Sequence, residues 1–290
     1  MLNTVVQLLV NGIAMGMIYA LMSMGLILLV RAVGVLNFAQ GDLLMLGAFA
    51  IFQLTMQMEV PLWAAFIIAL IFFLIAGAVF MFTCYWPVRS SKWTVAVTVC
   101  TIGASMVIKE AAKLIWGGSP LPVDPLAIGV FEIGPISIEK QYLIIILVAA
   151  FMIALVFTIF EKLYSGKLLQ AAAQDPYAAQ LLGIPPVITT MVTYMIVMVI
   201  VGFGGALVAP IFLASVNLAS LQLRAFAGAI IGGFGNLKGA ILGSLFIGII
   251  EAFSIVITST YKDAIVFLIM LIFLVVRPQG IFGEKVADKA

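Results

Sequence analysis

The sequence predicts an all-α fold, a polytopic bundle of transmembrane helices. Of the 290 residues, 65% are hydrophobic and only 9% are charged, and the mean hydropathy is +1.30. The apolar runs are long and unbroken, whereas the strands of a transmembrane barrel are short segments of alternating apolar and polar residues. We therefore expect seven to nine membrane crossings with broken or re-entrant helices and one short cytoplasmic helix, in a single transmembrane domain over residues 1–290.

The residue types that the chain lacks exclude several functions. It has no histidine, which removes His-dependent catalysis and imidazole zinc ligands. Cys84 and Cys100 fall in or beside apolar runs, where we expect small buried hydrophobes. The GGFGN glycines lack the Gly-Lys-Ser/Thr of a phosphate-binding loop, and no basic, aromatic-bearing patch suits nucleic acid. We predict a non-enzymatic chain without catalytic residues, metal or cofactor.

The first apolar run, Val5 to Val30, is predicted to be a retained membrane span. No Lys or Arg precedes Arg31, so the run lacks the basic start of a signal peptide. Small and polar residues lie four apart on one face, which suits close packing against a neighbouring helix. These pairs are Gln7 with Asn11 and Gly12 with Gly16.

Later apolar runs are predicted spans at Leu43 to Met58, Pro61 to Tyr85, Thr94 to Trp116, Gln141 to Phe160, Val187 to Leu213 and Ala264 to Val276. Each is long enough, or nearly long enough, to cross the hydrocarbon core as a helix. Gly117 to Lys140 is rich in Gly, Pro and acidic residues and is predicted to be a loop.

The segment from Arg224 to Phe253 carries glycines at helical spacings of four, three, four and four: Gly228, Gly232, Gly235, Gly239 and Gly243. At these spacings the glycines are expected to share one face. That face is either a packed stripe of small residues or part of a broken helix on a substrate route, with Asn236 and Lys238 at the break. The segment either crosses twice or dips into the membrane and returns.

Polar residues at membrane depth indicate a candidate translocation pathway, because burying them in hydrocarbon is costly. Asn37, Gln40 and Asp42 interrupt apolar sequence just after the first span. Asp42 lies where a helix begins. It either caps free N–H groups there or lines the pathway, where exposed N–H groups could bind a substrate carboxylate. Glu251 is expected to face the interior of the bundle.

The stretch from Lys167 to Pro186 is a polar interruption between two apolar runs. Asp175 followed by Pro176 is typical of a helix start, since the carboxylate can cap N–H groups and proline tolerates the first helical position. A helix through Leu182 is expected to end at Gly183, which can adopt a left-handed turn, before two prolines. A helix this short is marginal on its own and needs a surface to bind.

The basic residues in the connections predict the orientation. If the spans alternate in direction, eight basic residues fall on one side and three on the other. The richer side is expected to be cytoplasmic, which places the N-terminus outside and the C-terminus and the Lys167 to Pro186 stretch inside. The eight are Arg31, Arg89, Lys92, Lys162, Lys167, Arg277, Lys285 and Lys289, and the three are Lys140, Arg224 and Lys262.

Four separated stretches together resemble LivH-type permeases of branched-chain amino-acid ABC importers, in the same order along the chain. They are Gly34 to Phe49 (GVLNFAQGDLLMLGAF), Gln170 to Ile184 (QAAAQDPYAAQLLGI), Gly232 to Gly243 (GGFGNLKGAILG) and Val275 to Gly283 (VVRPQGIFG). The resemblance implies a bacterial inner-membrane permease subunit, paired with a second, LivM-like permease. It also implies two ATPase subunits, which use ATP and Mg²⁺, and a periplasmic binding protein that delivers leucine, isoleucine or valine.

By the same resemblance, the contact with an ATPase falls on Lys167, Gln170, Asp175, Pro176, Tyr177, Ala178, Ala179, Leu182 and Gly183. Two positions depart from the usual family pattern, which has arginine in place of Gln170 and histidine in place of Gln40. Related permeases carry urea, short amides or aromatic acids, so these are alternative cargoes.

Two other classes of function remain open. An ion-coupled secondary transporter or channel, acting without an ATPase, would use Asp42, Glu251 and the glycine-broken segment. A membrane scaffold that transports nothing would need only the glycine face. Uptake through this chain alone, driven by an ion gradient, would favour the first of these over an ATP-driven permease.

Overall fold

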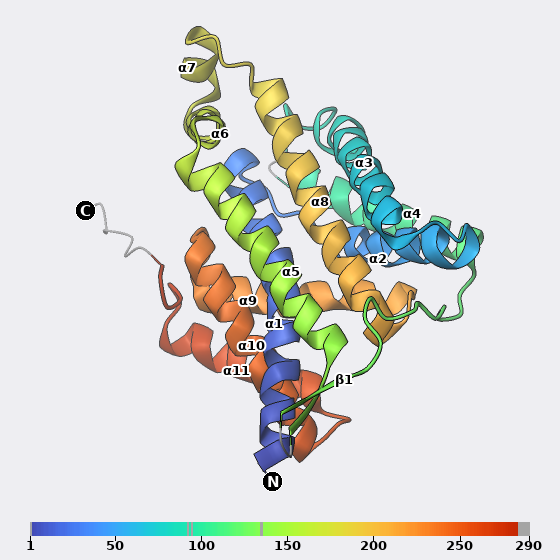
Figure 1. Cartoon of the computed structure of the whole chain (residues 1–290). Helices are drawn as coiled ribbons and strands as arrows, with labels where there is room; N and C mark the ends of the chain where they lie inside the picture. The colour runs from blue at the N-terminus through green and yellow to red at the C-terminus, as the bar shows by residue number, and fades with distance from the viewer. Residues whose placement is uncertain (1, 92, 94, 134–135, 284–290) are drawn as a thin grey trace. The chain divides into compact units, whose positions relative to one another are not determined.

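The computed structural model describes residues 2–91, 93, 95–133 and 136–283 (Figure 1). It confirms the all-α prediction, since the described chain is mostly helical and has one two-stranded sheet. The chain forms two compact units that interleave along the sequence. The first unit is drawn from Met1–Ile27, Leu126–Ile153 and Leu221–Ala290, and the second from Leu28–Pro125 and Ala154–Ser220. That the whole chain acts as one domain stays a prediction.

The elements follow the predicted apolar runs closely. In chain order they are α1 (Leu2–Val33), α2 (Gln40–Phe52), η1 (Gln53–Gln57), α3 (Leu62–Phe80), η2 (Met81–Tyr85), α4 (Ala96–Trp116), β1 (Val130–Ile133), β2 (Ile136–Glu139), α5 (Lys140–Phe157), η3 (Thr158–Lys162), α6 (Tyr164–Gln174), α7 (Pro176–Leu181), α8 (Pro186–Phe212), η4 (Val216–Ser220), α9 (Leu221–Gly232), α10 (Leu237–Ile257) and α11 (Lys262–Val276). Three basic residues used to predict the orientation, Lys92, Lys285 and Lys289, lie outside the described residues.

Among the described residues, five helices are long and apolar enough to cross a membrane: Asn3–Val33, Leu62–Tyr85, Lys140–Lys162, Pro186–Phe212 and Leu237–Val256. At 1.5 Å per residue, α9 with its 12 residues reaches only about 18 Å, well short of a hydrocarbon core of about 30 Å. α10 has 21 residues and reaches about 32 Å. The segment that carries the glycines is therefore one short and one full-length helix.

In the first unit, α1 packs directly against α10. A Cβ added to Gly12 would lie 2.9 Å from the Cα of Ile249, and one added to Gly16 would lie 2.8 Å from the Cα of Leu245. Side chains larger than hydrogen would push these backbones apart. The small face predicted for the first apolar run is confirmed.

The predicted loop from Gly117 to Lys140 contains a β-hairpin that the sequence prediction missed. Val130 pairs with Glu139 in antiparallel register. The strands have only four residues each, too short for their alternation to stand out from a loop rich in glycine and proline. The amide Nε2 of Gln7 donates to the carbonyl of Ser137 at 2.9 Å, so α1 holds the hairpin.

In the second unit, α2 and α8 make the closest helix contact. A Cβ added to Gly205 of α8 would collide with the carbonyl oxygen of Leu44 on α2, and one added to Gly47 would collide with that of Gly202. Nearly all of α2 is buried as a result. The α2 helix therefore forms the core of this unit, although its 13 residues are few for a membrane span.

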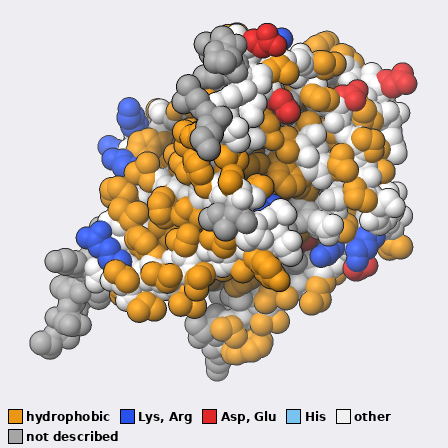
Figure 2. All heavy atoms as spheres, turned by 90° about the horizontal axis from the view of Figure 1, so that it is seen from below, with side chains coloured by type: hydrophobic (Ala, Val, Ile, Leu, Met, Phe, Trp, Pro, Cys, Tyr) orange, Lys and Arg blue, Asp and Glu red, His pale blue; other side chains and the backbone are white. Residues whose placement is uncertain are grey.

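Many apolar side chains face outward. Trp63 and Ile75 on α3 are 70% and 58% exposed, and hydrophobic side chains cover most of the described surface of the face in Figure 2. A water-soluble surface does not carry such large apolar patches. This surface suits contact with lipid or with another membrane subunit.

Candidate coupling and translocation sites

The start of α7 is capped as the sequence predicted. The Oδ1 of Asp175 accepts hydrogen bonds from the backbone N–H groups of Tyr177, at 3.0 Å, and Ala178, at 2.9 Å. Pro176 occupies the first helical position, where its missing N–H costs nothing. A single carboxylate thus fixes the first turn of a six-residue helix.

The end of α7 also agrees with the prediction to within one residue. Gly183 has φ +80°, and the N–H of Ile184 reaches back to the carbonyl of Ala179 at 2.9 Å. This is the turn by which glycine commonly ends a helix. The side chains of Tyr177, Leu181 and Leu182 stand out from α7, being 73 to 80% exposed, so α7 presents an apolar surface that the described chain does not cover.

α6 carries the other two residues predicted to take part in coupling. Lys167 is exposed. Gln170 is half-buried, and its Nε2 donates to the carbonyl of Phe160 at 2.6 Å. Phe160 lies in η3, which ends at Lys162, and the last carbonyls of a helix have no donor within the helix. Gln170 therefore braces α6 against the end of the preceding helix.

The polar residues at the start of α2 form a buried cluster with α4 in the second unit. Asn37, Gln40 and Asp42 are all nearly inaccessible. Two residues of α4 take part. The hydroxyl of Ser105 donates to the Oδ2 of Asp42, and the hydroxyl of Thr101 accepts from the backbone N–H of Phe38 at 3.2 Å. Together these contacts join the α2 start to α4.

Asp42 does not cap α2. Asp42 is the third residue of the helix, and its side chain bonds to Ser105. Its second oxygen, Oδ1, is buried without a hydrogen-bond partner among the described residues. The turn into α2 is made instead by Asn37, whose Oδ1 accepts from the N–H of Ala39 at 3.0 Å. Asp42 is therefore not the N-cap residue, although its carboxylate lies in the first turn, where the helix dipole favours it; its place in a pathway stays a prediction.

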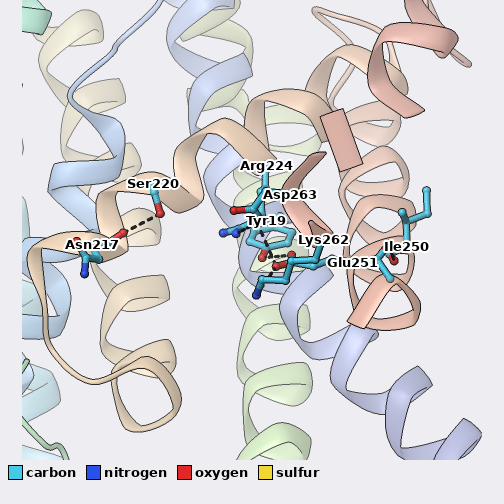
Figure 3. A network of polar contacts seen from close by, with 9 residues as sticks. Tyr19, Asn217, Ser220, Arg224, Ile250, Glu251, Lys262 and Asp263 are labelled. Atoms are coloured by element: carbon cyan, nitrogen blue, oxygen red, sulfur yellow. Dashed lines mark hydrogen bonds and ion pairs between the residues drawn. The ribbon is translucent and has the colours of Figure 1, made fainter. Parts of the chain in front are cut away.

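Glu251 faces the interior, as predicted, and its partners come from three other helices of the first unit (Figure 3). The Oε1 of Glu251 lies 3.2 Å from the Nε of Arg224 on α9 and 3.5 Å from the Nζ of Lys262 on α11. The hydroxyl of Tyr19 on α1 donates to its Oε2. Asp263 pairs with the Nη2 of Arg224.

This network has two cations and two anions, so its charges balance. The side chains of Arg224 and Glu251 are only 9% and 6% exposed, a setting in which an unpaired charge would be strongly unfavourable. Because the members lie on α1, α9, α10 and α11, the network ties four helices together. Its contacts favour a structural role for Glu251.

The glycines of α9 and α10 do not lie on one face of one helix, so that prediction is wrong. A turn separates the two helices, with Gly233 at φ +109° and Gly235 at φ +95°. Asn236 ends the turn by capping α10, since its Oδ1 accepts from the N–H of Gly239 at 3.1 Å. The break at Asn236 is confirmed. Lys238 is the second residue of the new helix.

Across the turn, the glycines of the two helices face one another. A Cβ on Gly232 would collide with the carbonyl of Gly239, and a Cβ on Gly243 with that of Gly228. Close packing of small residues is confirmed for these four. Gly235 differs, because an added Cβ would meet nothing within 4 Å; it serves the turn through its backbone conformation.

The four predicted pathway residues are divided between the two units of the fold. Asn37, Gln40 and Asp42 belong to the second unit and Glu251 to the first. Arg224 and Lys262 contribute to the sequence prediction only as basic residues that indicate the orientation. Tyr19 and Ser105 are not predicted from the sequence, because a hydroxyl in an apolar helix gives no local signal of its partner.

Comparison with known proteins decides the family. The chain matches the model described as branched-chain amino acid transport system / permease component over residues 8–274. It is 31% identical to the high-affinity branched-chain amino acid transport system permease protein LivH of Salmonella typhimurium, over 98% of this chain and 97% of that protein. The chain belongs to this permease family. The permease is also 30% identical to LivH of Escherichia coli and to BraD of Pseudomonas aeruginosa, with the same coverage.

Among solved structures, the permease resembles PsaBC from Streptococcus pneumoniae in complex with Fab, with a TM-score of 0.51 over 92% of this chain and 89% of that chain. The two share 14% sequence identity, so the likeness concerns the fold alone. The resemblance seen in the four sequence stretches is thus confirmed as family membership.

Proposed function

We propose that this permease is the membrane subunit of an ATP-binding-cassette importer that moves branched-chain amino acids from the periplasm to the cytoplasm. The named relatives that it matches over almost its whole length are permeases of high-affinity branched-chain amino acid systems. The chain itself has no phosphate-binding loop. Separate ATPase subunits, using ATP and Mg²⁺, supply the energy.

The observation that carries the proposal is α7. It is capped at its start by Asp175 and ended by Gly183, and it carries the exposed apolar side chains of Tyr177 and Leu181, with Leu182 just beyond its end. A helix of six residues has little stability of its own, and an apolar surface on a polar stretch calls for a partner. The partner is the groove of an ATPase subunit on the cytoplasmic side.

Contact with the ATPase divides between the two short helices. Tyr177, Ala178, Ala179 and Leu182 belong to the docked surface or support it, while Asp175, Pro176 and Gly183 shape the helix. On α6, Lys167 is available for a charged contact, and Gln170 transmits movement through its bond to η3. Movement of α7 with the ATPase would then reach the membrane helices through α6.

The translocation pathway includes Asn37, Gln40 and Asp42. The carboxylate of Asp42 has one oxygen held by Ser105 and the other without a partner in the described chain, so it can accept the ammonium group of an amino acid. Glu251 was predicted to line the same pathway, and its contacts favour a structural role instead, in which it holds α1, α9, α10 and α11 together.

The assembly contains a second, LivM-like permease, two ATPase subunits and a periplasmic binding protein, in the bacterial inner membrane. The N-terminus lies outside and the C-terminus in the cytoplasm. In this orientation the Lys167 to Pro186 stretch, with α7, faces the ATPases. The binding protein delivers the cargo from the opposite side.

The test is uptake of radiolabelled leucine into proteoliposomes. With all subunits, the binding protein and internal ATP, uptake is expected and should stop when hydrolysis is blocked with vanadate. Collapse of the proton gradient should leave it unchanged. The purified permease alone should neither hydrolyse ATP nor take up leucine. Ion-driven uptake through the permease alone would overturn the proposal in favour of a secondary transporter.

A further inference from the structure

A cavity of about 370 Å³ lies in the second unit, where the last turn of α1 meets η3 and α6. It is at the lower end of the range of about 300–1,000 Å³ that is usual for small-molecule sites. Leu28, Phe160 and Leu169 line it, and all three are buried. The cavity therefore offers an apolar floor to a small solute.

The charges that line the cavity come from one ion pair. The Nη1 of Arg31 lies 2.9 Å from the Oε1 of Glu161, and their side chains are 38% and 34% exposed. A pair this exposed contributes little on its own, so replacing it by contacts with a charged ligand would cost little. Gln170 and Gln174 on α6 add polar groups to the same lining.

One cation, one anion and an apolar floor together match a zwitterion with an apolar side chain. The carboxylate of a free aliphatic amino acid can pair with Arg31 and its ammonium group with Glu161, so that no charge loses its opposite partner. An inorganic phosphate ion would bring negative charge beside Glu161. A simple cation would be repelled by the positive charge of Arg31. The lining therefore favours the amino acid over either ion.

We propose that this cavity binds an aliphatic amino acid from the cytoplasm and that the bound molecule slows uptake. The class of ligand follows from the cavity itself, while its identity as the transported product rests on the proposed function. Gln174 ends α6 and directly precedes Asp175, the cap of α7. A ligand that joins the end of α1 to α6 would favour one position of α6 and so restrain α7.

Binding is measured on the purified complex, without the periplasmic protein, using radiolabelled L-leucine. Saturable binding is expected. Arg31→Gln and Glu161→Gln each remove one charge-assisted contact and should weaken binding by about tenfold or more. Ala173→Leu fills the cavity without changing charge and should abolish the part of leucine binding that these two variants weaken. Glu110→Gln breaks a comparable exposed pair with Lys113 and should bind leucine as the wild type does.

The same variants are then compared in proteoliposomes with and without leucine inside. Internal leucine should slow the wild type and Glu110→Gln but not Ala173→Leu, while all three transport alike into vesicles free of leucine. Absence of leucine binding by the wild type, unchanged binding in the cavity variants, or equal slowing of the wild type and Ala173→Leu would each overturn the inference. Binding that is lost in Ala173→Leu, in a complex that takes up no leucine under any condition, would support the cavity and overturn the proposed function instead.

Discussion

At the scale of single residues, Glu251 joins four helices through its ion pairs with Arg224 and Lys262 and its hydrogen bond with Tyr19. Replacing it by alanine would leave Arg224, which is nearly buried, with Asp263 alone, and would remove the acceptor of Tyr19. Removing one partner of a buried pair typically costs about 3–5 kcal/mol. We expect Glu251→Ala to lower the stability of the detergent-purified permease by an amount in that range.

Thermal unfolding followed by circular dichroism measures this loss. Glu110→Ala is the matched control, because Glu110 pairs with Lys113 at an exposed position, where a pair contributes about 0–1 kcal/mol. Equal melting temperatures for the two variants would contradict the structural role of Glu251.

Asp42 is the residue whose charge we expect to matter for cargo. Asp42→Asn can keep the hydrogen bond to Ser105 but loses the negative charge that would attract an ammonium group. Loss of one charge-assisted bond corresponds to about a tenfold or larger effect, so leucine uptake by the assembled complex should fall by at least that factor. Melting should change little. Uptake at the wild-type rate would exclude Asp42 from the pathway.

At the scale of elements, the contact between α2 and α8 depends on glycine. Gly205→Ala would bring its Cβ into the carbonyl of Leu44, and such overpacking costs about 1–3 kcal/mol. Gly103→Ala on α4 should instead stabilise the permease. An added Cβ there meets nothing within 4 Å, and alanine is more favourable than glycine in a helix by about 0.5–1 kcal/mol. The melting temperature should fall for Gly205→Ala and rise for Gly103→Ala. A change in the same direction for both variants would contradict the packing described.

α7 depends on its cap. Asp175→Ala leaves the N–H groups of Tyr177 and Ala178 without their acceptor, at a cost of about 1 kcal/mol, which is large for a six-residue helix. We expect leucine uptake to fall while the permease still inserts in the membrane. Asp175→Ser keeps a capping oxygen and should retain uptake. Equal uptake in both variants would argue against α7 as the coupling helix.

The elements that the sequence predicted well are those specified by neighbouring residues. Asp175, Pro176 and Gly183 lie within nine positions and define α7 almost to the residue, because caps and turns act locally. The bond between Tyr19 and Glu251 joins residues 232 positions apart, and periodicity in a single chain carries no information about such a pairing.

The glycines of α9 and α10 show the same limit at the scale of the whole molecule. The spacing of these glycines correctly predicted close packing. It also suggested that all of them share one face of a single helix, because the glycines on either side of the turn are as far apart in sequence as neighbours on one helix face. Only the left-handed backbone of Gly233 and Gly235 reveals that two helices meet. The chain therefore turns back within the segment, and this affects how the whole permease is threaded through the membrane.

The threading itself can be tested by labelling single cysteines. In a background with Cys84→Ala and Cys100→Ala, Ile128→Cys and Leu181→Cys introduce thiols at positions that are 84% and 73% exposed. The excess of basic residues predicts that the Leu181 side is inside. An impermeant maleimide should label Ile128→Cys in intact spheroplasts and Leu181→Cys only after the membrane is opened.

Coexpression of the ATPase subunits extends the labelling test from orientation to docking. Since Leu181 stands on the exposed face of α7, a bound ATPase would cover Leu181→Cys and slow its labelling in opened membranes, while Ile128→Cys should react at the same rate. Labelling of both cysteines from the same side would overturn the orientation. Unchanged labelling of Leu181→Cys with the ATPase present would remove α7 from the interface, because a docked six-residue helix has no face left for solvent along its apolar side.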